Sequence, residues 1–142
     1  MAADVSTERS KHIQLSSNTN ECQRLYDFLA QSLEQVPVTK EFRHDLKLVC
    51  EELFSNIINH SYEDDLEAQI DIELSVDEHS VRITFTDSGP AFNPLKREAP
   101  EDRGDLSEGG MGILLVKSLT DKQSYKRENK LNVFTVTKNY NN

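Results

Sequence analysis

Apolar residues recur along this chain with two different periods, and the two periods predict strands and helices. Alternation of apolar and polar residues predicts four strands, at residues 12–17, 69–76, 80–87 and 130–139. Helical spacing, or an apolar run entered through glycines, predicts three helices, at residues 18–36, from about 39 to 60, and 111–121. The resulting order, β-α-α-β-β-loop-α-β, predicts an α+β fold: a two-layer α/β sandwich in which a mixed, mostly antiparallel sheet carries helices on one face.

Capping residues and prolines predict where the first two helices begin and end. Asn18, with Glu21 three residues later, resembles a capping box, and Pro37 is expected to end the first helix. Thr39 is the expected N-cap of the second helix. The short link DEHS joins the two strands within residues 69–87, so these strands are expected to form an antiparallel hairpin.

The second helix combines a core stripe with polar groups along the border of that stripe. The stripe consists of Phe42, Leu46, Val49, Cys50, Leu53 and Ile57. Glu52, Asn56 and His60 follow one another at four-residue steps, so their side chains form a line along the helix. At roughly 100° per residue this line falls beside the core stripe. Such a border is where the wall of a cleft is expected.

Two further segments combine glycine with groups that could hold a ligand. Gly109, Gly110 and Gly112 come before the apolar run of the last helix, where free amides suit a phosphate. The same glycines could form only a turn, and they are no P-loop because no Lys-Ser/Thr follows. Asp87 ends a strand two residues before Gly89. It either forms an Asx-type turn or presents a carboxylate to an amine at the mouth of a pocket.

The three polar residues of the second helix have different expected roles. Asn56 could bond backbone groups, or it could be a neutral oxygen ligand of Mg²⁺, which binds few protein groups alongside phosphate oxygens. Glu52, one turn earlier, could order a metal-bound water or act as a general base. His60 is expected to cap or pack rather than to take part in catalysis.

Composition narrows the classes of partner and location. The 142 residues carry a formal net charge of −9, which argues against a nucleic-acid partner. An anionic ligand would have to be held by backbone amides or a metal. No apolar run is long enough to span a bilayer, and residues 1–12 are too polar for a secretory signal, so a cytoplasmic location is expected. Cys50 lies on the core stripe and is expected to be a small buried hydrophobe.

Domain organisation is predicted from the absence of an interdomain linker. Residues 1–142 are expected to form a single domain. Residues 88–110 mix prolines, glycines and charges of both signs, which predicts a long loop. A loop of this length in a compact domain is usually functional or disordered.

Taken together and in this order, the motifs resemble one superfamily. Glu-x3-Asn-x3-His on a helix, Asp-x-Gly after a hairpin and Gly-Gly-x-Gly entering a helix are similar to the ATP-binding fold shared by DNA gyrase, its related heat-shock chaperone, histidine kinases and mismatch-repair ATPases. The helix of Glu52 and Asn56 resembles the N-box, DSGPAF the first glycine box, and GGMGILLV the second. The resemblance implies a histidine-kinase-like (Bergerat-type) ATPase fold with residues 93–109 as the ATP lid.

Within that superfamily the chain resembles the bacterial anti-sigma factor serine/threonine kinases, over roughly residues 10–140. NIINHSY resembles the family's Asn-x3-His-x-Tyr, and GGMGILLVKSLTD its second box with a trailing Leu-x-Asp. DSGPAFNP resembles Asp-x-Gly-x-x-Phe-Asp-Pro, with Asn93 where the family often has Asp. Asn93 is peripheral, so little effect is expected. The acidic segment REAPEDRGDLSE shows no lid motif, which leaves the lid's part in catalysis open.

The resemblance implies an activity and partners. Members of that family bind Mg-ATP, phosphorylate a serine or threonine of an anti-anti-sigma (STAS-type) protein and sequester a sigma factor, usually as homodimers. Carried onto this chain, Asn56 would ligand Mg²⁺ and Glu52 would activate the substrate hydroxyl. Asp87, beside Gly89, would read the adenine amino group of ATP or ADP. The phosphates would be held by Gly110 and Gly112 and by the amides of Met111 and Ile113.

Within the kinase hypothesis, Arg103 in the lid could neutralise developing charge, which is an expectation from its position and sign alone.

Two alternatives to the kinase hypothesis remain. A non-catalytic switch that binds nucleotide and a partner would keep Asn56 and the glycines but need no base, and the presence of Glu52 favours the kinase. A stand-alone ATPase related to histidine kinases is the third reading, and the absence of a phosphoacceptor helix pair counts against it.

Overall fold

The computed structural model describes residues 9–61, 68–96 and 110–140, of which residues 60, 61, 110 and 111 are described by their backbone alone. One layer is a five-stranded sheet with the order β1-β2-β3-β5-β4. The strands are β1 (Arg9–Ser16), β2 (Gln69–Val76), β3 (Ser80–Asp87), β4 (Lys122–Glu128) and β5 (Leu131–Asn139). Each neighbouring pair is antiparallel, so this sheet contains no parallel pair among the residues described.

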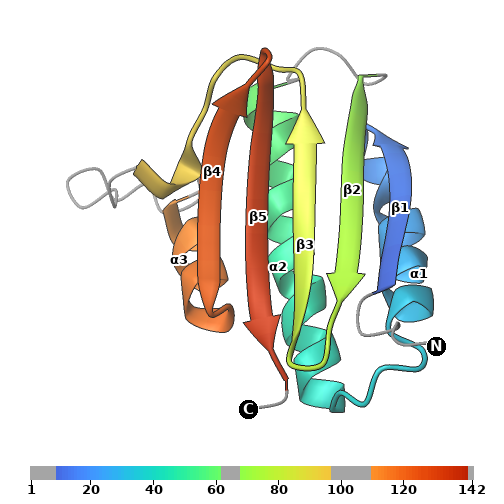
Figure 1. The fold of residues 1–142 in the computed structure, drawn as a ribbon. Helices are drawn as coiled ribbons and strands as arrows, with labels where there is room; N and C mark the ends of the chain where they lie inside the picture. Colours follow the sequence, from blue (N-terminus) through green and yellow to red (C-terminus); the bar gives the residue numbers. More distant parts are fainter. Residues whose placement is uncertain (1–8, 62–67, 97–109, 141–142) are drawn as a thin grey trace.

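Helices form the second layer, and Figure 1 shows them behind one face of the sheet. They are α1 (Cys22–Ser32), α2 (Lys40–Ser61) and α3 (Gly110–Leu119), with short 3₁₀ helices η1 (Thr19–Glu21) and η2 (Pro94–Lys96). In that view α1 lies behind β1, α2 behind the centre of the sheet, and α3 behind β4. The predicted α+β class and two-layer arrangement are therefore confirmed.

The central hairpin of β2 and β3 supplies much of the core, and its predicted bounds are confirmed. Alternate residues of both strands are buried: Ile70, Ile72, Leu74, Val76, Val81, Ile83 and Phe85. Their side chains share the face that α1 and α2 cover, because successive strand residues point to opposite faces. Because this face is buried, the pairing register of β2 with β3 is strongly specified, and Asp87 lies at the end of β3 on the same face.

The start of α1 differs from the prediction in detail. Asn18 is the N-cap of η1, and its side chain accepts a hydrogen bond from the amide of Asn20 at 2.9 Å. Glu21 accepts from the amide of Ser16 at 2.9 Å rather than from Asn18, so the capping box is not formed. That backbone hydrogen bond lowers the pKa of the Glu21 carboxyl. The helix ends at Ser32 and not at Pro37, because the following residues continue as hydrogen-bonded turns.

The long helix α2 begins as predicted. The amide of Phe42 donates to Oγ1 of Thr39 at 3.0 Å, which confirms Thr39 as the N-cap. All predicted core positions except Ile57 are buried: Phe42, Leu46, Val49, Cys50 and Leu53. Phe54 and Ile58 are also buried and widen the stripe. Burial raises the pKa of the Cys50 thiol, which agrees with a packing role.

The strand β4 was not predicted, and it is the main error in the expected element order. It lies at the edge of the sheet and pairs with β5 alone, so its side chains are mostly exposed and polar. Asn129 and Lys130 form the turn between the two strands, with φ angles of 54° and 66°. Positive φ at both residues is typical of a type I′ hairpin turn.

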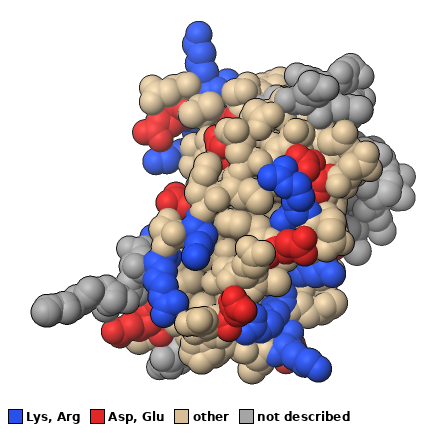
Figure 2. Space-filling model, turned by 90° about the vertical axis from the view of Figure 1, so that its right-hand side faces the viewer, with Lys and Arg blue, Asp and Glu red and all other residues tan. Residues whose placement is uncertain are grey.

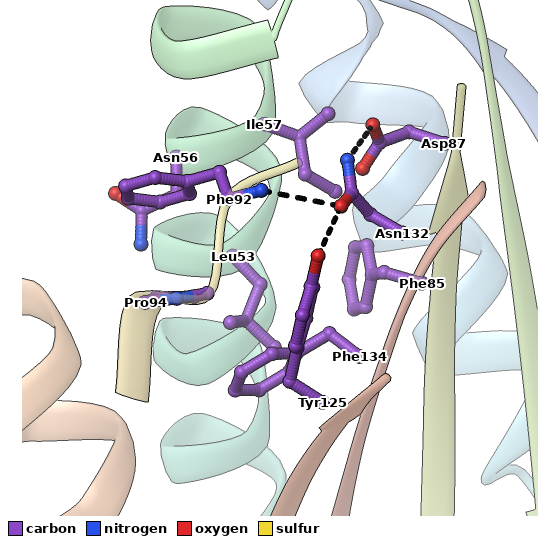
Figure 3. Close-up of a pocket in the computed structure, with 10 residues that line it drawn as sticks. All are labelled: Leu53, Asn56, Ile57, Phe85, Asp87, Phe92, Pro94, Tyr125, Asn132 and Phe134. Atoms are coloured by element: carbon purple, nitrogen blue, oxygen red, sulfur yellow. Dashed lines mark hydrogen bonds between the residues drawn. The ribbon is translucent and has the colours of Figure 1, made fainter. Parts of the chain in front are cut away.

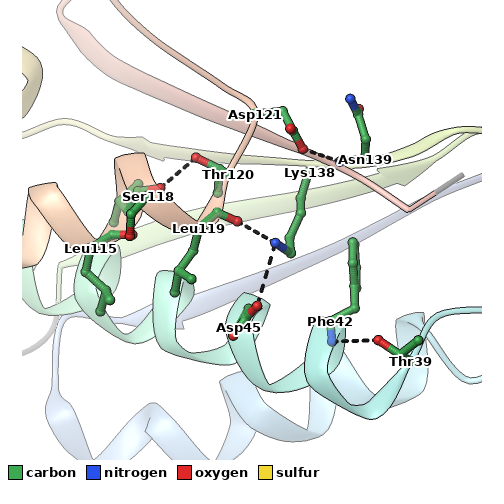
Figure 4. Close-up of polar contacts among 11 residues, drawn as sticks. Thr39, Phe42, Asp45, Leu115, Ser118, Leu119, Thr120, Asp121, Lys138 and Asn139 are labelled. Atoms are coloured by element: carbon green, nitrogen blue, oxygen red, sulfur yellow. Dashed lines mark hydrogen bonds and ion pairs between the residues drawn. The ribbon is translucent and has the colours of Figure 1, made fainter. Parts of the chain in front are cut away.

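Lys138 of β5 joins the two helices that carry the predicted site (Figure 4). Its Nζ donates to the carbonyl oxygen of Leu119, the last residue of α3, at 2.6 Å. The same Nζ lies 3.8 Å from Oδ2 of Asp45 in α2. A cation at the end of a helix satisfies a free carbonyl and opposes the negative end of the helix dipole. Lys138 therefore stabilises the position of α3 beside α2.

Charges are mixed on the side of the molecule that carries α1 and β1. Figure 2 shows lysine and arginine interspersed there with aspartate and glutamate. The net negative charge is therefore not segregated onto this side. No helix in the described part of the chain is both long and apolar enough to cross a membrane.

Candidate nucleotide site

A pocket lies between α2, the end of β3, the loop after β3 and the β4–β5 hairpin (Figure 3). Its walls are mostly apolar or aromatic, with a few polar groups. The lining residues are Leu53, Asn56, Ile57, Phe85, Asp87, Phe92, Pro94, Tyr125, Asn132 and Phe134. A pocket of this kind suits a flat ring that carries a small number of hydrogen-bonding groups.

Asp87 forms the Asx-type turn that its sequence position suggested, and it also lines the pocket. The residue is 5% exposed. Its Oδ1 accepts from the amide of Gly89 at 2.9 Å, which forms an Asx-type turn, and from Nδ2 of Asn132 at 3.0 Å. Within the described ranges no protein group donates to Oδ2. A buried carboxylate oxygen without a donor is costly, so Oδ2 is ready to accept a hydrogen bond from a ligand.

Asn132 is a site residue that the sequence analysis missed. It is 4% exposed and stands directly opposite Asp87 in the pairing of β3 with β5. In Figure 3 its amide lies between Asp87 and Tyr125. Asn132 shares the inward face of β5 with Phe134 and Val136. The sequence signal that could have identified Asn132 was a polar amide at a core position of a predicted strand. Its partner, Asp87, could not be identified in this way, because that pairing depends on the register between β3 and β5.

Two further contacts hold the loop after β3, and one of them comes from Arg127, which the sequence analysis did not single out. Nη1 of Arg127 donates to the carbonyl oxygen of Gly89 at 2.8 Å. The amide of Phe92 donates to Oδ1 of Asn132 at 3.3 Å. Gly89 itself is buried, so the loop backbone passes close to the pocket. These contacts fix the loop against the β4–β5 hairpin.

Asn56 lines the same pocket from α2. It is 7% exposed, and its side chain has no hydrogen-bond partner among the residues the structure describes. In Figure 3 the amide projects from the helix on the side of Phe92 and Pro94. A buried amide of this kind is unfavourable unless a ligand, an ion or water completes its hydrogen bonds.

Glu52 lies one turn before Asn56 and faces the start of α3. A Cβ atom added to Gly112 would overlap Oε1 of Glu52 and lie 3.2 Å from its Cδ. Glycine at position 112 therefore allows the carboxylate to approach the backbone of α3 closely. The line of Glu52 and Asn56 does border the core, as predicted. The side chain of His60, the third residue of that line, lies outside the described residues.

The glycine segment forms the first turn of α3 rather than a loop before it. The helix begins at Gly110, so Gly110, Met111, Gly112 and Ile113 are its first four residues. These are the positions whose amides lack partners inside an α-helix, and they attract anions. Ile113 is 3% exposed and anchors this turn in the core. Gly109 lies outside the described residues.

Most of the predicted lid, residues 97–109 with Arg103, also lies outside the described residues. Its first part is described at η2, where Asn93 caps the short helix. Oδ1 of Asn93 accepts from the amide of Leu95 at 2.9 Å, and its carbonyl oxygen accepts from the amide of Lys96 at 3.1 Å. Asn93 therefore has a structural role, which an aspartate could also fill.

The described residues suit a metal ion that is coordinated mainly by phosphate and water oxygens and only by one or two protein groups. They contain no group of three or more histidine, cysteine, aspartate or glutamate side chains that could bind a metal alone. The buried Asn56 amide without a partner offers a neutral oxygen. Mg²⁺ commonly binds through one or two protein oxygens together with phosphates and water. Asn56 thus fits this type of site.

Comparisons with known proteins agree with this geometry. The chain matches the Histidine kinase-like ATPase domain family over residues 15–138. It is 31% identical over 86 residues to the serine-protein kinase RsbW of Oceanobacillus iheyensis, which covers 54% of this chain and 53% of that protein. It is 28% identical over 103 residues to the anti-sigma F factor of Bacillus subtilis, covering 68% of each. The chain therefore spans about half the length of the RsbW relative.

A solved structure supports the same fold. The RsbU and RsbW domains of Rv1364c from Mycobacterium tuberculosis superpose with a TM-score of 0.64 at 16% identity. The match covers 93% of this chain and 32% of that one. The family match and the curated relatives, rather than this structure, confirm the resemblance to anti-sigma kinases within the ATPase superfamily.

Proposed function

Because the chain belongs to the Histidine kinase-like ATPase domain family, we propose that it binds Mg-ATP and phosphorylates a serine or threonine of an anti-anti-sigma protein. The observation that carries the proposal is the contact between Glu52 and the first turn of α3. It brings a carboxylate beside the amides that would hold the phosphates. The names of the relatives, serine-protein kinase and anti-sigma factor, support the same activity.

The nucleotide would be held at both ends of the cleft. Its base would enter the apolar pocket, where Oδ2 of Asp87 would accept from the exocyclic amine. Its phosphates would meet the amides of the first turn of α3, from Gly110 to Ile113. Backbone amides at a helix N-terminus attract anions without adding a side-chain charge. This arrangement would hold an anionic ligand in a chain whose net charge is −9.

Asn56 would hold Mg²⁺ through its side-chain oxygen, together with phosphate oxygens of the nucleotide. When bound, the ion neutralises charge on the transferring phosphoryl group. Asn56 lies one turn from Glu52 on α2, so the metal and the reacting hydroxyl would meet on the same wall.

Glu52 would act as the general base. Its carboxylate accepts the proton of the substrate hydroxyl as the hydroxyl oxygen bonds to the γ-phosphorus. The bond between that phosphorus and the β–γ bridging oxygen breaks, and ADP leaves. Proton removal by a positioned carboxylate typically contributes a factor of about 10² to 10⁴ in rate. The proton remains on Glu52 until solvent removes it.

The partners belong to the same proposal. The phosphorylated protein would be of the STAS type, and the chain would sequester a sigma factor. The chain would act as a homodimer, and a sigma-factor partner would place it in the cytoplasm. The relatives named RsbW and anti-sigma F factor support these partners.

Transfer of labelled phosphate from ATP to a set of STAS-type proteins of the same genome tests the proposal. Glu52→Gln should retain ADP binding and lose at least about 100-fold in transfer rate. Glu51→Gln is the matched control, because Glu51 is the adjacent carboxylate and hydrogen-bonds Tyr26 instead. Nucleotide binding without transfer to any of these proteins would indicate a binding switch, and full activity of Glu52→Gln would exclude the base role.

A further inference from the structure

We infer that Asn132 and Tyr125 fix the orientation of the Asp87 carboxylate and thereby set the preference of the pocket for a purine with an exocyclic amine. The inference rests on the proposed function, because it concerns the same pocket. Neither residue belongs to the motifs that the sequence analysis singled out. Both act through Asp87, so they are positioning residues.

The amide nitrogen of Asn132 has two close acceptors and a third, longer one. Nδ2 donates to Oδ1 of Asp87 at 3.0 Å and to the carbonyl oxygen of Pro90 at 2.9 Å. The carbonyl oxygen of Gly89 lies 3.4 Å from the same nitrogen. Oδ1 of Asp87 is thereby tied to β5 as well as to its own turn. The carboxylate is held at one oxygen, and the other remains for the ligand.

The amide oxygen of Asn132 accepts hydrogen bonds from two donors. Oη of Tyr125 donates to Oδ1 at 2.5 Å, and the amide of Phe92 donates at 3.3 Å. Figure 3 shows Asn132 between these donors and Asp87. If the amide were flipped, its oxygen would face the Asp87 carboxylate, which only accepts, and its nitrogen would face the amide of Phe92, which only donates. These two groups exclude the flipped orientation, and the hydroxyl of Tyr125 then adds a second donor that holds Oδ1 in place.

The fixed orientation has a consequence for base selection. A carboxylate oxygen accepts a hydrogen bond from an exocyclic amine and repels a carbonyl oxygen at the same place. A site built to hydrogen-bond one group rejects analogues that lack it, provided its own buried polar group cannot turn away. Gly89 is buried, and Phe92 and Tyr125 are half-buried, so water competes poorly for their hydrogen bonds to Asp87 and Asn132.

Calorimetric titration with ADP and inosine diphosphate, in which a carbonyl oxygen replaces the amine, tests the inference. Tyr125→Phe keeps the ring in the pocket wall but removes one donor to Asn132. The ratio of ADP to inosine diphosphate affinity should fall by about three- to ten-fold, as for one hydrogen bond. Asn132→Ala removes the hydrogen bonds that Nδ2 donates to Asp87 and to Pro90, and it should lower the affinity ratio further.

Tyr140→Phe is the matched control. It removes a tyrosine hydroxyl that donates to the carbonyl oxygen of Asp77 at 2.6 Å, in the turn between β2 and β3, outside the pocket. The ratio of ADP to inosine diphosphate affinity of Tyr140→Phe should equal that of the wild type. Equal losses of both affinities in Tyr125→Phe, with an unchanged ratio, would overturn the inference. Failure of the wild-type chain to bind ADP would instead overturn the proposed function.

Discussion

At the scale of the residue, Asn56 is the group whose position is hardest to explain without a ligand. Its side chain is buried, with no partner among the described residues. Asn56→Ala should lower the affinity for Mg-ADP by at least about tenfold, because a ligand of the cation is lost. The free energy of unfolding should change by less than about 1 kcal/mol, since no protein hydrogen bond is broken among the described residues.

Calorimetry and urea unfolding measure the two effects of Asn56→Ala separately. Asn59→Ala provides the control, because Asn59 lies on the same helix but is exposed. Near-normal Mg-ADP affinity in Asn56→Ala would remove the metal assignment. A large loss of stability would show that the amide has a structural role instead.

Gly112 is the second residue whose identity follows from a contact. In Gly112→Ala the new methyl group would meet the Glu52 carboxylate, which can rotate away because it ends a flexible side chain. Stability should therefore change by less than about 1 kcal/mol, the scale of the helix-propensity gain of alanine over glycine. Phosphate transfer should fall as the base is displaced. Leu114→Ala, on the exposed side of α3, should transfer phosphate normally. Wild-type transfer by Gly112→Ala would contradict this account.

The site residues differ in how far the sequence could reveal them. Asp87, Asn56 and Glu52 stand at fixed spacings within single elements, so local patterns suffice to single them out. Asn132 becomes recognisable only when β5 is paired with β3, because only that register sets it opposite Asp87. Such pairing joins segments far apart in the chain, and local periodicity carries no information about it.

At the scale of the element, the strands with a buried face were predictable and the edge strand was not. The strands β2 and β3 alternate because one face is buried against helices. The edge strand β4 has mostly exposed side chains, so its sequence KQSYKRE lacks that alternation. Charged and polar residues are common on edge strands, where they oppose association with other chains. The hairpin that supplies Tyr125 was therefore missed with its strand.

The junction at Lys138 gives a prediction at this scale. Lys138→Met removes the donor to the last turn of α3 and leaves Asp45 without its cation. The free energy of unfolding should fall by about 1–2 kcal/mol, as for a partly buried hydrogen bond from a charged donor. Lys122→Met is the control, because Lys122 is an exposed lysine of β4. Equal urea midpoints for the two variants would show that Lys138 does not hold α3.

At the scale of the whole molecule, the two layers could be predicted, but the complete lining of the pocket between them could not. Amphipathic helices and alternating strands require a helix layer on a sheet. The pocket forms where α2, the end of β3 and the β4–β5 hairpin meet, and this meeting depends on the strand order β3-β5-β4. The net charge of −9 opposes an anionic ligand, so binding should depend on a cation.

Titration of the purified chain with ADP, with and without Mg²⁺, is the most direct test of the proposed nucleotide site. We expect binding in the presence of Mg²⁺ and an affinity at least about tenfold lower without it, a difference of about 1.4 kcal/mol or more. In the same titration inosine diphosphate should bind more weakly than ADP. A folded chain that binds no ADP with Mg²⁺, or that binds it equally well without, would contradict the account.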